Sequence, residues 1–171
     1  GDDAADACES AALAQVEVPD GRHAMPVFTS AEAMKAWDPS ARPVPVYGPQ
    51  AAQAAASAGD GLILLDPGDE AVLIPRPAVW SLAAGTEWVP AWQDEALGVE
   101  AARALAGIAG TLGVALMPGR SAEVAAVVLV QDGLDRAAAQ DMLGQVAAAF
   151  GANEVLRERV DSLEIVPTRQ I

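Results

Sequence analysis

Short apolar runs alternate with turn residues through the first half of the chain, and this pattern predicts small paired strands. Two hairpins are expected, because proline, aspartate and glycine occur together between neighbouring apolar runs at 19–21 and 66–69. Proline presets φ, aspartate tolerates turn geometry and glycine supplies a positive φ. The apolar runs that flank these turns are 13–18 with 23–28, and 61–65 with 71–74.

Helix signals lie between these strands. Thr29 with Glu32 three residues later has the spacing of a capping box, which predicts a helix to about Trp37. The run Pro43–Val46 predicts a short strand, edge-like because of its prolines. Two further helices are expected at 51–58, which is nearly all alanine, and from Pro77 to Gly85. The first half is therefore predicted as β-β-α-β-α-β-β-α.

The second half has longer elements. A helix over 94–108 is predicted because Leu97, Ala101, Leu105 and Ile108 recur at helical spacing. Strands are expected at 112–116, 123–130 and 162–166, with a long helix at 135–150 and a short first strand at Glu87–Val89. The long helix is expected to face inward with Met142, Leu143, Val146 and Phe150. These patterns predict an α+β protein of two small subdomains. If Glu87–Val89 is a strand, the second subdomain follows the ferredoxin-like order (β)αββαβ.

We expect residues 1–10 to form a mobile acidic entry segment, because they hold four acids and no base. The change from short to longer predicted elements near 85–93 predicts a first domain at 11–88 and a second at 89–171. The chain begins without Met, so we expect it to be a trimmed piece with sequence missing upstream.

Charge excludes several partners. The chain carries 24 acids against 10 scattered bases, a formal charge of −14, and such a surface repels nucleic-acid backbones and anionic membranes. No apolar run approaches the roughly 18 residues of a membrane span. Cys8 has no second cysteine for an internal disulfide, which favours a reducing, cytoplasmic setting. We therefore expect no nucleic acid and no membrane among the partners.

Candidate chemistry is sparse. His23 is the one conventional base near neutral pH, and it lies beside a turn with no nucleophile motif, so we interpret it as a surface residue. A single histidine excludes a two-histidine metal site. Asp66, Asp69 and Glu70 form an acidic turn that either binds a divalent cation or, as we expect, serves the turn alone. No glycine-rich phosphate loop occurs, so neither cofactor nor metal is predicted, and no catalytic residue is assigned.

Three tryptophans, Trp80, Trp88 and Trp92, fall within thirteen residues across the expected domain boundary. Tryptophan is usually a core or interface residue. We expect these side chains to line a seam between the two halves. The alternative is an exposed hot spot that binds a partner.

Several blocks of the sequence resemble one family. The stretch Pro19–Pro39, with its Asp-Gly-Arg, Pro-Val-Phe-Thr-Ser and Trp-Asp-Pro motifs, is similar to the SseB N-terminal domain in its actinobacterial form. Arg42–Val46, Asp66–Gly68 and Arg76–Trp80 also fit that pattern. The late stretch Arg157–Ile165 resembles the end of the SseB C-terminal domain.

The resemblance implies an SseB N-terminal-like domain at 11–88, an SseB C-terminal-like domain at 89–171 and a cytoplasmic bacterial setting. It implies no catalytic residues, because the family has none established. Our leading hypothesis is a non-catalytic protein-binding or regulatory module with a protein partner or as a homodimer. The alternative is a binder of small, amino-acid-related molecules or a weak enzyme. The candidate binding residues are Trp80, Trp88, Trp92, Asp66 and Arg76.

Overall fold

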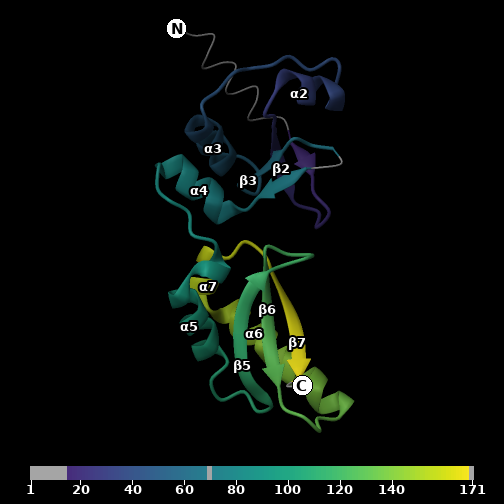
Figure 1. Ribbon diagram of the computed structural model, residues 1–171, viewed down its shortest axis with the longest axis vertical. Coiled ribbons are helices and arrows are strands. Elements are labelled where there is room, and N and C mark those ends of the chain that lie inside the picture. The colour runs from purple at the N-terminus through teal and green to yellow at the C-terminus, as the bar shows by residue number, and fades with distance from the viewer. Residues whose placement is uncertain (1–14, 69–70, 170–171) are drawn as a thin grey trace. The chain divides into compact units, whose positions relative to one another are not determined.

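The structure is a computed structural model that describes residues 15–68 and 71–169. It divides into two units, Gly1–Trp88 and Val89–Ile171 (Figure 1). Each unit combines helices with one mixed sheet, so the predicted α+β class is confirmed. The predictions for the entry segment, Cys8, Asp69 and Glu70 lie outside the described residues.

A four-stranded sheet forms the centre of the first unit, in the order β1-β2-β3-β4. The strands are β1 (Val16–Glu17), β2 (His23–Val27), β3 (Leu62–Leu65) and β4 (Val72–Ile74). The pairs β1–β2 and β3–β4 are antiparallel, which confirms both predicted hairpins, whereas β2 and β3 run parallel. At the first turn Gly21 has a φ of +84°, the conformation that glycine adopts without steric cost.

The helices of the first unit are α2 (Ala31–Trp37), α3 (Gly48–Ser57) and α4 (Arg76–Ala84). Helices α3 and α4 pack beside each other, and their buried side chains meet those of β2 and β3. This core consists of Met25, Ala51, Ala52, Ala55, Ile63 and Val79. Half of it is alanine, so helix and sheet approach closely but bury little apolar area per residue.

The predicted strand at Pro43–Val46 is wrong. This segment belongs to the connection between α2 and α3 and pairs with no other strand among the described residues. Its two prolines lack the N–H groups that a ladder needs, and the side chains of Val44 and Val46 are about two-fifths exposed. Without a buried face, the segment gains nothing from joining the sheet.

The N-terminus of α2 differs from the predicted capping box by one residue. Ser30, not Thr29, is the N-cap, and its hydroxyl oxygen accepts a hydrogen bond from the Ala33 N–H at 3.0 Å. The Thr29 hydroxyl donates to Asp66 instead. A tertiary partner 37 residues away therefore decides which hydroxyl caps the helix.

The second unit is a three-stranded sheet in the order β5-β6-β7. Its elements are η1 (Ala91–Gln93), α5 (Glu95–Ala104), β5 (Thr111–Pro118), β6 (Val124–Val130), α6 (Arg136–Ala152), α7 (Glu154–Arg159) and β7 (Leu163–Arg169). The predicted inward positions Leu97, Met142, Val146 and Phe150 are buried in one continuous core with β5 and β6. Helix α6 lies against one face of this sheet (Figure 1).

The ferredoxin-like arrangement is wrong, because Glu87–Val89 is not a strand. Val89 is 45% exposed and precedes Pro90, and the segment pairs with no strand in the part of the chain that the structure describes. In a ferredoxin-like sheet that strand separates the two parallel strands of the split β-α-β unit. Here β6 pairs directly with β7 in parallel, and α6 and α7 make the crossover between them.

Candidate functional site

The first candidate surface is a cation–aromatic pair on α4. Arg76 and Trp80 are four residues apart, which places them on the same side of a helix. The guanidinium carbon of Arg76 lies 5.2 Å from the centre of the Trp80 ring, and the Trp80 side chain remains 42% exposed. Tryptophan is the best aromatic partner for a cation, and arginine is the cation found most often over its face. The structure thus brings together two of the five residues selected from the sequence.

Gly61, directly before β3, lies next to this pair. Gly61 has a φ of +72°, and a Cβ added there would lie 3.5 Å from Cγ of Arg76 and 3.8 Å from Nε1 of Trp80. Glycine therefore supplies the turn conformation before β3 and lies next to both side chains. Helix α4 begins at Arg76, and Pro77 lies in its first turn, where proline favours helix initiation. The pair is therefore located at the beginning of the helix. The result is a cation–aromatic pair with an exposed tryptophan beside Gly61.

Asp66 has a structural partner. Its carboxylate accepts hydrogen bonds from the Thr29 N–H at 2.8 Å and the Thr29 hydroxyl at 2.6 Å. The hydroxyl bond, followed by the backbone bond, holds the pKa of Asp66 below its ordinary value. Asp66 has a φ of +47°, which aspartate tolerates better than most residues. This geometry ties the end of β3 to the start of α2.

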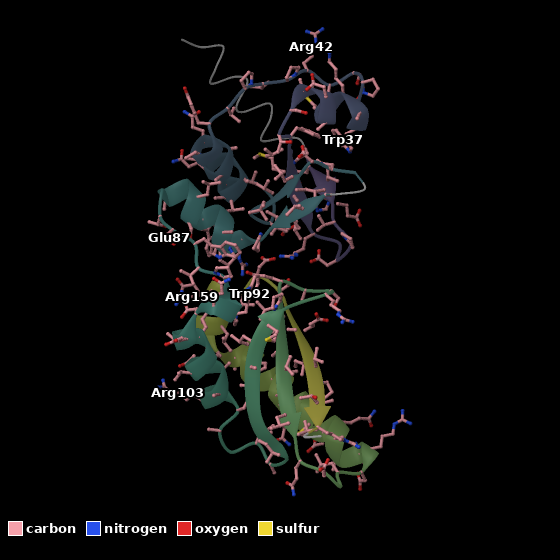
Figure 2. All side chains as sticks on the ribbon, in the orientation of Figure 1. Trp37, Arg42, Glu87, Trp92, Arg103 and Arg159 are labelled. Atoms are coloured by element: carbon pink, nitrogen blue, oxygen red, sulfur yellow. The ribbon has the colours of Figure 1, made fainter. Side chains whose placement is uncertain are left out.

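The other two tryptophans occupy different environments. Trp88 is half-buried in the irregular segment after α4. Trp92 belongs to η1 and packs against the core of the second unit (Figure 2). The seam that we expected between the halves stays a prediction.

Carboxylates also organise the second unit. Glu164 on β7 accepts hydrogen bonds from the Arg120 N–H and from the N–H and hydroxyl of Ser121. The Ser121 hydroxyl makes the larger contribution to lowering the pKa of Glu164. Gly119 is required beside this network, because a Cβ there would lie 2.1 Å from the Ala122 carbonyl oxygen. Together these contacts hold the β5–β6 turn against the start of β7.

Asp94 has a double role in the same unit. Its carboxylate caps α5 through the N–H groups of Ala96 and Leu97 and also pairs with Arg159 of α7. Figure 2 labels Arg159. The pair joins two helices that pack on one core. The Asp94–Arg159 pair therefore has a structural role, because it links α5 to α7.

A shallow depression of about 240 Å³ lies between the end of α5 and the start of β5. Its walls are Ala102, Leu105, Ala106, Gly107, Ile108, Thr111, Leu112, Gly113 and Val114. None of these side chains titrates near neutral pH or ligates metals well. The depression offers apolar contact and a threonine hydroxyl, and it lacks a general base.

His23 is an exposed first residue of β2, and its backbone N–H donates to Asp60 at 2.7 Å. In the adjacent turn, Asp20 pairs with Arg22 at 2.8 Å. Within residues 15–68 and 71–169 no group of three histidine, cysteine or acidic side chains could hold a metal ion. The same residues contain no helix long and apolar enough to cross a membrane.

These observations define a mixed α+β protein whose first unit presents an Arg76–Trp80 pair with an exposed tryptophan and a half-buried arginine. Residues 1–81 match the family model described as the SseB protein N-terminal domain. This match supports the resemblance to the SseB family for the first unit. No curated protein and no solved structure matches the chain.

Proposed function

We propose that this chain is a cytoplasmic bacterial protein of the SseB family, of the actinobacterial type, with an SseB C-terminal-like domain in its second half. We propose further that it is a non-catalytic module that binds or regulates a protein partner. The match over residues 1–81 supports the family assignment. The surface that supports the binding role is the Arg76–Trp80 pair.

The observation that carries this proposal is the exposure of Trp80 in its pair with Arg76. Trp80 is 42% exposed although the Arg76 guanidinium lies over its ring at 5.2 Å. Tryptophan and arginine are among the residue types most enriched at side chains that dominate binding energies. A ring that is already paired leaves less side-chain entropy to be lost when a partner binds it.

Affinity capture from the native bacterium, followed by mass spectrometry, tests this function. We expect a partner that the wild-type chain captures to be lost with Trp80→Ala. Leu82→Ala is the matched control, because Leu82 is also 42% exposed but lies two residues along α4 and therefore on another face. Equal capture by wild type and Trp80→Ala would contradict the proposed surface.

The same preparation distinguishes the small-molecule alternative. A ligand that binds the native state raises the midpoint of thermal unfolding in proportion to the logarithm of its concentration. If amino acids or their relatives raise the melting temperature, and no specific partner is recovered, the protein-binding proposal fails. We expect no such shift.

A further inference from the structure

The connection between α2 and α3 has an unusual local conformation. Arg42 and Val44 each precede a proline, which restricts them to an extended or polyproline II backbone. Pro43 and Pro45 themselves have φ fixed at about −65°. Tyr47 has φ −76° and ψ 144°, close to the polyproline II values of about −75° and +145°. We refer to residues 42–47 as the connector.

The connector's backbone is open to solvent. Among the described residues, no backbone N–H or C=O of residues 42–46 takes part in a hydrogen bond within the chain. All six side chains are exposed, and Tyr47 reaches 79%. A solvated backbone without internal hydrogen bonds is characteristic of polyproline II. The prolines therefore hold an extended ligand-like segment without help from a sheet.

Charge sets the connector apart from the rest of the surface. Arg42 is the one charged residue between Pro39 and Gly59, in a chain whose formal charge is −14. Figure 2 shows its side chain projecting away from the ribbon. Interface centres are depleted in charge and enriched in tyrosine and arginine. This surface therefore has the composition of a binding segment, and its single cation calls for an acidic group on the partner.

We propose that the connector is a polyproline II ligand that docks into an aromatic-lined groove of a partner protein, with Arg42 held by a carboxylate at the groove's end. Polyproline II repeats every three residues, so Arg42 and Pro45 share one ridge and Val44 and Tyr47 share the next. These two adjacent ridges enter the groove, and Pro43 with Val46 faces solvent. Preformed polyproline II segments bind such grooves with little loss of chain entropy.

This inference rests on the proposed function because both need a protein partner, but it uses a different surface. The probes are purified SH3 and WW domains, whose grooves are lined by aromatic rings. Titration of the full chain, followed by heteronuclear NMR, should show saturable binding by at least one probe with shifts in the connector. Chemical shifts of Val44 and Tyr47 in the free chain should report polyproline II.

The valines provide a matched pair, because the side chains of Val44 and Val46 are 40% and 41% exposed. We expect Val44→Ser and Arg42→Glu to weaken probe binding at least tenfold, while Val46→Ser changes it less than threefold. Unchanged melting temperatures would show that each variant is folded. The proposal is overturned if no probe binds, if both valine variants weaken binding equally, or if the connector is not polyproline II.

Two further outcomes separate this inference from the proposed function. In the first outcome, capture of the native partner requires Trp80 but not Val44, and no SH3 or WW domain binds. The proposed protein-binding function then stands, and the connector proposal fails. If sedimentation velocity shows a dimer that Val44→Ser dissociates, the occupant is a second copy of this chain and the groove proposal is overturned.

Discussion

The two units of this protein use apolar residues in different ways. The second unit buries leucine, valine and phenylalanine in one continuous core beneath β5 and β6. The first unit fills its helix–sheet interface largely with alanine and leaves Trp37, Tyr47 and Trp80 substantially exposed. The second unit also exposes aliphatic side chains, but its two aromatic residues, Trp92 and Phe150, pack against or within its core. The units therefore differ in that the first exposes aromatic side chains, the type most enriched where binding energy is concentrated.

Two valines test this comparison most directly. Val146 of α6 and Val79 of α4 are both fully buried on helices, one in each unit. We expect Val146→Ala to destabilise the second unit by about 2–4 kcal/mol and Val79→Ala to destabilise the first by about half as much, because small alanine-lined walls collapse more readily. Native-state hydrogen exchange of amides in β6 and β3 measures the two units separately. A larger loss for Val79→Ala would reverse the comparison.

Backbone crowding in the second unit gives the next largest effect. Gly119→Ala places a Cβ 2.1 Å from the Ala122 oxygen, so the β5–β6 turn must shift. We expect a loss of about 1–3 kcal/mol, in the range found for overpacking. Gly144→Ala in α6 is the control, because nothing lies within 4 Å of the added Cβ, and it should stabilise the unit by about 0.5–1 kcal/mol. Chemical denaturation followed by hydrogen exchange distinguishes the two.

The cap of α2 predicts a smaller effect in the first unit. Ser30→Ala removes the acceptor for the Ala33 N–H and should cost about 1 kcal/mol. Glu32→Ala should change stability by less than about 0.5 kcal/mol, because Glu32 does not occupy the capping-box position when Ser30 is the cap. Exchange rates of β2 amides measure both changes. A larger effect of Glu32→Ala than of Ser30→Ala would restore the capping box that the sequence suggested.

The smallest expected effect is the acid sensitivity of Asp66. Because its folded pKa is lowered, Asp66 stabilises the fold fully above the unfolded pKa near 3.8, and this stabilisation is lost as pH falls through the folded value. Solvent exposure limits its size. We expect Asp66→Asn to weaken the first unit at pH 7 and to flatten its stability profile below pH 4. Glu164→Gln should do the same for the second unit, below its ordinary value of 4.5. If stability depends on pH in the variant as it does in the wild type, protonation of that carboxylate does not contribute to acid unfolding.

Local patterns in the sequence predicted most of the elements but not the connections between them. Both hairpins and the long helix α6 follow from turn residues and spacing alone. The strands predicted at 43–46 and 87–89 failed, because a strand requires a partner and a buried face, and neither is visible in a short apolar run. Helix α7 was missed because its six residues hold one buried position, Leu156, which is too few for a helical repeat to be visible.

The candidate site was predictable only as separate residues. Arg76 and Trp80 are selected by residue type and by the motif that they share, and their spacing of four is visible in the sequence. The closeness of Gly61 to both side chains is not visible, because it arises from the packing of α4 beside β3. Asp66 likewise looks like a turn residue or a cation ligand until Thr29 is seen to donate two hydrogen bonds to its carboxylate.

The sequence by itself determined the α+β class, the hairpin turns, the inward stripe of α6 and the charge that disfavours nucleic acid. These depend on neighbouring residues or on composition, so short-range chemistry suffices. Only the tertiary structure decided which hydroxyl caps α2, which carboxylates serve as structural links and which apolar side chains remain exposed. Those outcomes depend on groups distant in the chain competing for the same donors and the same buried space.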